Sequence, residues 1–259
     1  MVDDYIKDGL LHCGKCNTPK QVILTIGGRD VMIDCTCECE QARMQAERDA
    51  AEKKANIERI KENRRAGFPD REIAKHTFEA DDNKNPKLTS IAKAYVQHFP
   101  EMLDAGKGIL FYGGVGTGKT FLAACIANAL IDKGYACLVT NFSRLINKIG
   151  GLYDGKQEYI DSLNAFDLLI IDDLAAERST EYVREIVNNV IDARYRAGLP
   201  LIVTTNLTAD ELKYPDDIAR ERTYSRLMEM CVFVNVDGTD RRKEKLKQDH
   251  ARLKGVLGL

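Results

Sequence analysis

Short apolar runs alternate with longer segments of helical periodicity through most of this chain. Five runs are almost wholly apolar, and they occupy residues 109–112, 136–140, 168–171, 201–205 and 231–236. Continuous apolar runs are typical of parallel strands, because helices cover both faces of such a sheet. The pattern therefore predicts an α/β domain with a parallel sheet over residues 67–239.

The regions outside this domain have a different composition. Residues 1–39 are rich in cysteine and interrupted by glycine. Residues 40–66 consist largely of alanine and charged residues and contain neither proline nor glycine. That composition predicts a helical linker with almost no apolar face, which is either a solvated spacer or a helix that binds a partner. A basic tail follows at 240–259.

Composition and charge narrow the class of protein. The chain has 259 residues, is 44% hydrophobic and carries a net charge of −2, so it holds a sizeable core and has no overall attraction to nucleic acid or a membrane. No apolar run reaches the roughly 18 residues of a membrane span, and the first residues do not resemble a signal peptide. We therefore expect a cytoplasmic protein whose eight cysteines are thiols or metal ligands.

Residues 113–120 read GGVGTGKT, between an apolar run and a helical segment. Glycines let successive backbone N–H groups converge on a phosphate, and the helix that follows directs its positive end at the same anion. Lys119 is expected to reach the β- and γ-phosphates, and Thr120 to bind Mg²⁺. The predicted phosphate-binding residues are Gly113, Gly114, Val115, Gly116, Thr117, Gly118, Lys119 and Thr120.

Polar residues follow two of the predicted strands at their carboxyl ends, where open α/β sheets bind ligands. Asp172 and Asp173 come directly after the run at 168–171, and Asn206 follows the run at 201–205. We expect Asp172 to hold Mg²⁺ through water and Asp173 to orient the attacking water. Asn206 is expected to contact the γ-phosphate, although asparagine also starts ordinary turns.

These motifs, in this order, resemble those of AAA+ ATPases. The amino-acid sequence resembles helicase loaders of the DnaC/DnaI type and their IstB relatives more closely still. The resembling segments are 64–79, 114–130, 168–182, 190–207 and 220–231. The resemblance implies an ATPase that self-associates through its AAA+ domain and loads a replicative DNA helicase onto single-stranded DNA. Two alternatives stay open. One is an IstB-like transposition ATPase acting on double-stranded DNA, and the other is a nucleotide-dependent adaptor with negligible hydrolysis.

The resemblance also implies roles for three arginines. Arg226 is the first candidate, and Arg222 the second, for an arginine finger that reaches the ATP bound by a neighbouring subunit. An ordinary surface ion pair is the alternative for both. Arg241 resembles the arginine that senses the γ-phosphate within its own subunit. Asp173 stands where many AAA+ enzymes have glutamate, so the resemblance implies slow turnover.

Five cysteines in the first 39 residues have the spacing of a structural zinc site. Cys13 and Cys16 form a CxxC pair, and Cys35, Cys37 and Cys39 follow after a turn-like Gly-Gly. Tetrahedral Zn²⁺ needs four ligands, and spacing leaves open which two of the last three take part. A redox pair or an iron–sulfur site is the alternative. Loaders of the DnaI type resemble this layout, in which the amino-terminal domain grips the helicase. The remaining cysteines are expected in the core, at Cys125, Cys137 and Cys231.

The segment 146–163 lies where, by resemblance, loaders and initiators contact single-stranded DNA. Lysines follow phosphates and aromatic rings stack on bases. The candidates are therefore Lys148, Tyr153, Lys156 and Tyr159, with an ordinary helix and surface loop as the alternative. The tail at 240–254 has seven lysines and arginines against three acidic residues. It fits either a nucleic-acid backbone or a solvated helix.

Overall fold

The computed structural model describes residues 3–174, 180–215 and 217–243, and in the tail 246, 250, 253, 254 and 256. The chain forms two compact units, Met1–Arg59 and Ile60–Leu259. The division falls inside the long helix α1 (Glu38–Gly67), several residues before the boundary expected at 66/67. The last residues of α1 belong to the second unit because two of them bond to it. Asn63 donates to the Gly134 carbonyl, and Arg64 donates to Asn128.

The second unit contains a five-stranded sheet whose neighbouring strands are all parallel, in the order β6-β7-β8-β5-β9. The strands are β5 (Gly108–Tyr112), β6 (Cys137–Asn141), β7 (Leu168–Leu174), β8 (Leu201–Thr205) and β9 (Cys231–Asn235). Each of the apolar runs forms one of these strands, so the predicted parallel sheet is confirmed.

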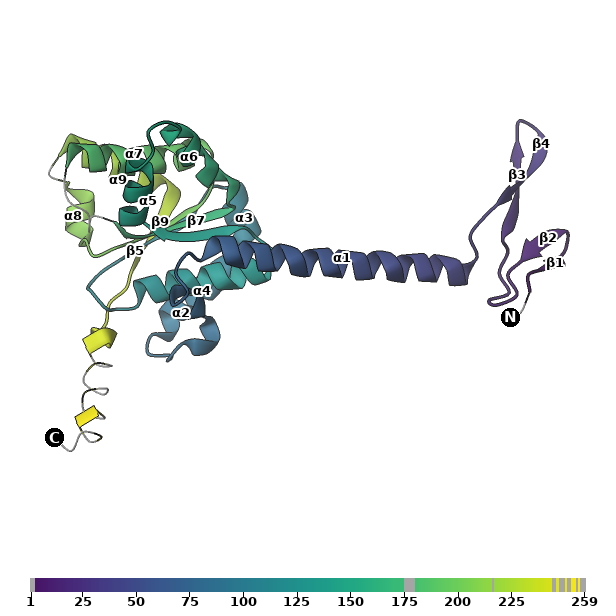
Figure 1. The fold of residues 1–259 in the computed structure, drawn as a ribbon, viewed down its shortest axis with the longest axis horizontal. Helices are drawn as coiled ribbons and strands as arrows, with labels where there is room; N and C mark the ends of the chain where they lie inside the picture. The colour runs from purple at the N-terminus through teal and green to yellow at the C-terminus, as the bar shows by residue number, and fades with distance from the viewer. Residues whose placement is uncertain are drawn as a thin grey trace. The chain divides into compact units, whose positions relative to one another are not determined.

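Helices cover both faces of the sheet (Figure 1). One side holds α2 (Pro86–Gln97), α3 (Phe99–Asp104) and α4 (Lys119–Asp132) over one buried apolar cluster. The other side holds α5 (Phe142–Gly150), α6 (Lys156–Ser162), α7 (Glu181–Arg196) and α9 (Ile218–Met230) over a second cluster. The described residues of this unit also form short helices, namely η1 (Ile73–Lys75), η2 (Phe78–Ala80), η3 (Leu163–Ala165) and α8 (Ala209–Lys213). Cys125, Cys137 and Cys231 are buried in this unit, as expected.

The first unit consists of two β-hairpins and the beginning of α1. Strand β1 (Tyr5–Lys7) pairs with β2 (Leu10–His12), and β3 (Gln21–Ile26) pairs with β4 (Arg29–Asp34), both antiparallel. Among described residues 3–59, the only buried side chains are those of Cys13 and Cys37. So small a region cannot fold on apolar burial alone.

Among the described helices, none is long and apolar enough to cross a membrane.

Candidate functional site

The loop between β5 and α4 takes a shape that only glycine adopts easily. Gly113, Gly116 and Gly118 have φ angles of 133°, 76° and 105°. A Cβ on Gly113 would lie 2.7 Å from the Val236 carbonyl oxygen, and one on Gly116 would lie 2.0 Å from the Asp240 carboxylate. The glycines therefore let the loop curl and let the segment after β9 pack directly against it.

Lys119 begins α4 and lies inside the loop. Its Nζ donates to the carbonyl oxygens of Gly113 at 2.9 Å and Gly114 at 2.7 Å, and to Asn206 Oδ1 at 2.8 Å. The residue is only 5% exposed, and burial lowers the pKa of its ammonium group. Its hydrogen-bond acceptors among the described residues are neutral oxygens, and a buried cation in such a place is suited to an anionic ligand. Lys119 and Asn206, which were both expected to contact the γ-phosphate, are in direct contact with each other.

Thr120 and Asp172, the two predicted Mg²⁺ residues, are in direct contact. The Thr120 hydroxyl donates to Asp172 Oδ1 at 2.8 Å and lies 3.0 Å from Oδ2. The hydroxyl of Thr204, on β8, also donates to Asp172 Oδ1. A hydroxyl and a carboxylate at the edge of a phosphate loop are ligands that Mg²⁺ accepts, so the residues fit the ion. Sequence reasoning did not identify Thr204.

Asp173 lies in a β-bulge. The pairing of β7 with β8 is interrupted between Ile171 and Leu174, and Asp173 has a φ of 59°, in the left-handed region. Its backbone N–H donates to the Thr204 hydroxyl at 3.0 Å. The bulge therefore turns Asp173 out of the ladder, and its side chain lines the cavity beside the loop.

The charges around Asp173 are mixed. Desolvation in the cavity and the adjacent Asp172 carboxylate raise the pKa of Asp173, while Arg242 and Lys119 oppose the shift. A carboxylate with a raised pKa accepts a proton more readily than an ordinary surface aspartate. This arrangement is suited to polarising a water molecule.

These groups line a single cavity of about 570 Å³. Its lining residues are Ile73, His76, Ala80, Asp82, Val115, Gly116, Thr117, Gly118, Lys119, Thr120, Phe121, Asp172, Asp173, Asn206, Arg241 and Arg242. The loop residues, the strand-end residues and Arg241 were foreseen, but Asp82 and Arg242 were not. Nor were Ile73, His76, Ala80 and Phe121. They carry no recognisable motif, since a mainly apolar pocket wall looks like core in a sequence.

His76 and its surroundings indicate whether the cavity also fits a nucleobase. Its Nδ1 is buried and has no hydrogen-bond partner among the described residues, and its ring centroid lies 5.3 Å from that of Phe121. Burial lowers the pKa of His76 below its ordinary value of 6.5, so the ring is neutral at pH 7. An apolar wall with one unpaired neutral imidazole fits an aromatic ring with polar edges. The residues present therefore fit ATP.

Two arginines of the segment after β9 lie at the mouth of the cavity. The backbone N–H of Arg241 donates to the Gly116 carbonyl at 3.0 Å, and its guanidinium forms an ion pair with Asp82 at 3.0 Å. Arg242 also lines the cavity. Arg241 therefore lies beside the phosphate loop of its own chain.

Arg226 and Arg222 lie elsewhere, and neither lines this cavity. Arg226 forms an ion pair with Asp192 at 2.7 Å and a hydrogen bond with Asn188 at 3.0 Å, both on α7. Arg222 is exposed and borders two hollows between α7 and α9. Both positions are compatible with action on a different subunit. The contacts favour Arg222 as the side chain available to reach one.

The DNA candidates divide into exposed and packed residues. Tyr153 is 98% exposed in the loop between α5 and α6, and Lys148 and Lys156 are also exposed. The Lys156 ammonium lies 5.4 Å from the ring centroid of Tyr182. Tyr159 instead is half-buried and packs against the apolar cluster on this side of the sheet, and burial raises its pKa. Tyr159 is therefore less accessible to a base than Tyr153 is.

The basic tail at 240–259 is described only in part. Residues 244, 245, 247–249, 251, 252, 255 and 257–259 of the predicted nucleic-acid-binding tail lie outside the described residues.

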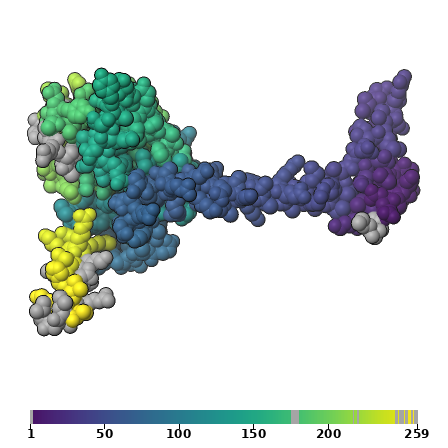
Figure 2. Space-filling model, in the orientation of Figure 1, coloured from purple at the N-terminus to yellow at the C-terminus, as the bar shows by residue number. Residues whose placement is uncertain are grey.

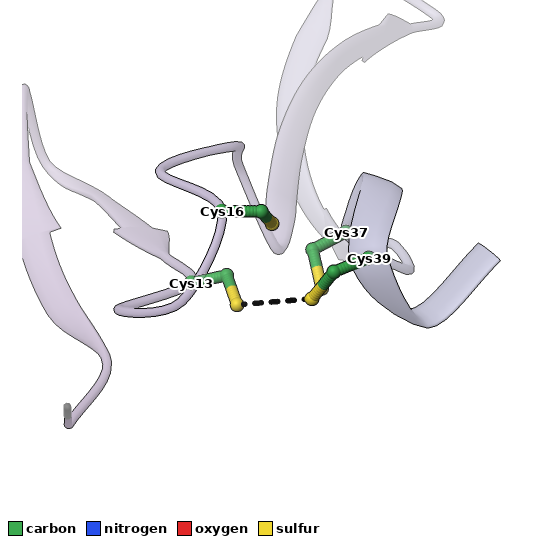
Figure 3. Close-up of side chains that lie close together, drawn as sticks. All are labelled: Cys13, Cys16, Cys37 and Cys39. Atoms are coloured by element: carbon green, nitrogen blue, oxygen red, sulfur yellow. Dashed lines mark hydrogen bonds between the residues drawn. The ribbon is translucent and has the colours of Figure 1, made fainter. Parts of the chain in front are cut away.

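The structure shows which two of the last three amino-terminal cysteines lie beside the CxxC pair, a question that spacing left open. Figure 3 shows Cys13 and Cys16, from the turn after β2, facing Cys37 and Cys39 at the beginning of α1, with all four sulfur atoms within 4.8 Å of one another. Cys39 Sγ lies 3.6 Å from Cys13 Sγ and 3.4 Å from Cys37 Sγ. Tetrahedral Zn²⁺ with Zn–S bonds of about 2.3 Å requires sulfurs about 3.8 Å apart, so the four thiols fit the ion.

Cys35 is exposed and stays outside the cluster. Its backbone N–H donates to the Lys20 carbonyl at 2.7 Å, which extends the β3–β4 ladder, and its Sγ turns to the Pro19 carbonyl. Strand geometry therefore continues through Cys35, and the chain turns into α1 only afterwards. That turn brings Cys37 and Cys39 to the CxxC pair.

Thr18, which sequence reasoning missed, connects the two halves of the cluster. Its hydroxyl lies 3.0 Å from Cys16 Sγ and accepts the backbone N–H of Glu38 at 3.0 Å. The Thr18 contact is the largest cause that lowers the pKa of Cys16 to about 5. The neighbouring sulfurs, Cys37 first, raise the pKa of Cys39 to about 12. Zn²⁺ binds cysteines as thiolates, so binding the ion would release protons from the cluster.

The fold and the cavity together define a P-loop ATPase fold of the AAA+ type. The chain belongs to the IstB-like ATP-binding protein family, whose model matches residues 46–249.

Similar proteins include helicase loaders. The chain is 28% identical over 184 residues to the replicative helicase loader DnaI of Bacillus subtilis, covering 64% of this chain and 58% of that protein. It is 27% identical over 127 residues to the replicative helicase loader DnaC of Escherichia coli strain K12, covering 48% and 51%. The match thus spans little more than half the length of these loaders. A putative ATP-binding protein in an insertion sequence of Mycobacterium tuberculosis is 28% identical over 193 residues, covering 70% and 72%.

Solved structures share the fold. The crystal structure of DnaI superposes with a TM-score of 0.56 at 22% identity, covering 66% of this chain and 96% of that chain. The AMPPCP-bound DnaA from Aquifex aeolicus gives a TM-score of 0.52 at 22% identity, covering 68% and 56%.

Proposed function

We propose that this chain is an ATPase that loads a replicative DNA helicase onto single-stranded DNA. The observation that carries the proposal is its similarity to DnaI and DnaC, both replicative helicase loaders, in a chain with a complete nucleotide cavity. Hydrolysis does no chemistry on the DNA or the helicase. Its free energy shifts the population of assembly and DNA-binding states.

Each cavity residue has a distinct part in hydrolysis. The loop N–H groups and Lys119 bind and orient the phosphates, Thr120 and Asp172 hold Mg²⁺, and Asp173 positions the attacking water. Bound Mg²⁺ would neutralise charge on the phosphates. Asn206, whose Oδ1 accepts a hydrogen bond from Lys119, is the residue we expect to contact the γ-phosphate.

We place the helicase-binding surface on the β3–β4 hairpin. One face of the hairpin carries five aliphatic side chains that are 38–59% exposed, namely Val22, Leu24, Ile26, Val31 and Ile33. Figure 2 shows this hairpin projecting from the rest of the amino-terminal unit. A contiguous exposed apolar face marks an interaction site. The replicative helicase is the occupant we propose, since helicase loading is what the loaders' names state.

The DNA-binding surface we propose is the loop between α5 and α6. Tyr153, almost fully exposed, offers a ring on which a base stacks, while Lys148 and Lys156 attract the backbone. Tyr182 supports Lys156 from α7.

The insertion-sequence relative favours a second candidate, a transposition ATPase acting on double-stranded DNA. One feature weighs against it. The match to the IstB-like family begins at residue 46, so the four clustered cysteines lie outside the shared region. A metal-held unit with an exposed apolar face supports a protein partner for this chain, as a loader requires.

A loading assay on closed circular single-stranded DNA tests the proposal. With the replicative helicase of the same host, we expect this chain plus ATP to raise the amount of DNA-bound helicase several-fold. Lys119→Ala should abolish the gain, because nucleotide no longer binds. No gain with the wild-type chain would refute loading. Tighter binding to double-stranded DNA, with filaments, would support the transposition ATPase. If a non-hydrolysable ATP analogue gives the full gain in DNA-bound helicase over repeated loading cycles, the result would support the nucleotide-dependent adaptor.

The hairpin provides a matched pair of variants for the same assay. Leu24→Glu places a charge on the apolar face, whereas Ile23→Glu places it on the opposite face at a residue that is 50% exposed. We expect Leu24→Glu to lose helicase pull-down and Ile23→Glu to keep it. ATP binding should be unchanged in both. Equal losses would show that the face we propose is wrong.

His76 should determine the preference for adenine. We expect His76→Phe, which keeps a stacked ring and removes both nitrogens, to weaken ATP binding by about tenfold and GTP binding less, since one lost hydrogen bond in a dry site is worth about 1–2 kcal/mol. Binding of fluorescent ATP and GTP analogues measures the ratio. Ile73→Val is the control and should weaken both equally. An unchanged ATP-to-GTP ratio in His76→Phe would exclude base recognition by this residue.

A further inference from the structure

We propose that Thr204 is a positioning residue for ATP hydrolysis, whose hydroxyl sets the placement of both acidic residues at the end of β7. The inference rests on the proposed ATPase function and deepens it. Thr204 does not line the cavity, so it acts only through Asp172 and Asp173.

The two hydrogen bonds of Thr204 have fixed directions. The backbone N–H of Asp173 can only donate, and it donates to Thr204 Oγ1 at 3.0 Å. The hydroxyl proton is therefore free for Asp172, where it is donated to Oδ1. A hydroxyl has one proton and two acceptor sites, so one side chain satisfies both contacts. Thr204 is 0% exposed, and water does not compete for them.

The bulge explains why a side chain is needed here. In a regular ladder, a neighbouring backbone carbonyl on β8 would accept the Asp173 N–H. The register break between Ile171 and Leu174 removes that partner. The Thr204 hydroxyl takes its place, and Asp173 stays in the left-handed conformation at φ 59°, a conformation that aspartate holds only when its surroundings impose it.

The same hydroxyl also holds the Asp172 carboxylate, together with Thr120. Asp172 Oδ1 accepts from both Thr120 and Thr204. When Thr120 turns to Mg²⁺, Thr204 remains as the protein contact that orients the carboxylate. Its loss should therefore misplace both the metal ligand and the residue that orients water, while Lys119 still binds the phosphates.

The experiment compares Thr204→Val, which keeps the shape and removes the hydroxyl, with Thr204→Ser, which keeps the hydroxyl. We expect kcat to fall about 10- to 100-fold in Thr204→Val, the size of effect that small misplacements have, and to stay near wild type in Thr204→Ser. Nucleotide affinity without Mg²⁺ should stay within about twofold in both.

Thr205→Val is the matched structural control. Thr205 is also 0% exposed, and it donates to the Leu174 carbonyl at 2.9 Å and accepts from the Leu207 N–H at 3.1 Å. Thr205→Val loses the same number of buried hydrogen bonds as Thr204→Val. Thr205, however, does not contact Asp172 or Asp173. We expect similar loss of thermal stability with kcat retained. An equal fall of kcat in Thr205→Val would reduce the role of Thr204 to strand stability.

Binding of Mn²⁺ to the protein–ADP complex, followed by electron paramagnetic resonance, gives a readout separate from turnover. Thr204→Val should weaken Mn²⁺ binding and Thr204→Ser should not. If the wild type does not hydrolyse ATP, the proposed function fails, yet the Mn²⁺ comparison still decides the role of Thr204. Wild-type kcat and Mn²⁺ affinity in Thr204→Val would overturn the inference. If Thr204→Val does not fold, a low kcat in folded Thr204→Ser would overturn it equally.

Discussion

Arg222→Ala should bind ATP as the wild type does and lose about 100- to 1,000-fold in hydrolysis at concentrations where chains assemble. Arginine fingers contribute roughly 10³–10⁵-fold in other phosphoryl-transfer systems. We expect less here because Asp173 is shorter than the glutamate common in AAA+ enzymes, and we therefore expect a slow basal reaction. Phosphate release, measured across a series of protein concentrations, checks the loss.

The contacts of the two arginines give the reason for choosing Arg222. Arg226 has two partners on α7, the Asp192 carboxylate and the Asn188 amide, so leaving them for a neighbour's phosphate costs a paired charge. Arg222, one turn earlier on the same face of α9, is exposed beside open hollows. We therefore expect Arg226→Ala to lower activity mainly by loosening the packing of α7 on α9.

Mixing experiments separate the two residues. A Lys119→Ala chain offers a finger without bound ATP, and an Arg222→Ala chain offers bound ATP without a finger. Mixed together, they should recover part of the activity that neither has alone. Arg226→Ala with Lys119→Ala serves as the comparison. If activity recovers only when Arg226→Ala is mixed with Lys119→Ala, Arg226 and not Arg222 is the arginine finger. No recovery in either mixture, with co-assembly confirmed by light scattering, would place both arginines in intramolecular roles.

The sequence predicted the sheet and the phosphate loop because both depend on local composition. A strand buried on both faces must be apolar throughout, and β5 to β9 have that character. A loop with three left-handed φ angles needs glycine at those positions. The carboxyl ends of parallel strands share one edge, so Asp172 and Asn206 were expected at the ligand-binding edge of the sheet, and both line the cavity beside the loop.

The features that sequence reasoning missed depend on tertiary contacts. Thr204, about 30 residues away in the chain, accepts the Asp173 N–H at the bulge in β7. The unpaired Nδ1 of His76 becomes a site only because Phe121, on α4, packs beside it. Neither residue belongs to a pattern that a single sequence displays, since threonine in a strand and histidine in a turn are both ordinary.

The cysteine choice shows the limit of spacing. Alternate residues of a strand share one face, so Cys35, Cys37 and Cys39 were equivalent as long as the strand was taken to continue through all of them. The strand β4 ends at Asp34 and α1 begins at Glu38, and this change of geometry separates Cys35 from the other two.

The loss of zinc in Cys37→Ser is the second large effect we expect. Purified without chelator, the wild-type chain should hold one zinc, and Cys37→Ser should hold almost none, because three thiols remain. Cys35→Ser is the matched control, since Cys35 is exposed and outside the cluster, and it should keep its zinc. Elemental analysis measures the metal, and iron with visible absorbance would indicate an iron–sulfur centre instead.

The structural consequence should be confined to the first unit. Among described residues 3–59, only Cys13 and Cys37 are buried, so without the metal nothing else provides a core, and the free energy of metal binding is the free energy of folding. Limited proteolysis should therefore remove the amino-terminal residues of Cys37→Ser rapidly and leave those of Cys35→Ser intact. ATP binding should persist in both variants, because the ATPase unit has its own two apolar clusters. Helicase binding should be lost with the zinc. Zinc loss in Cys35→Ser, or a protease-resistant first unit in Cys37→Ser, would contradict the assignment of the four ligands.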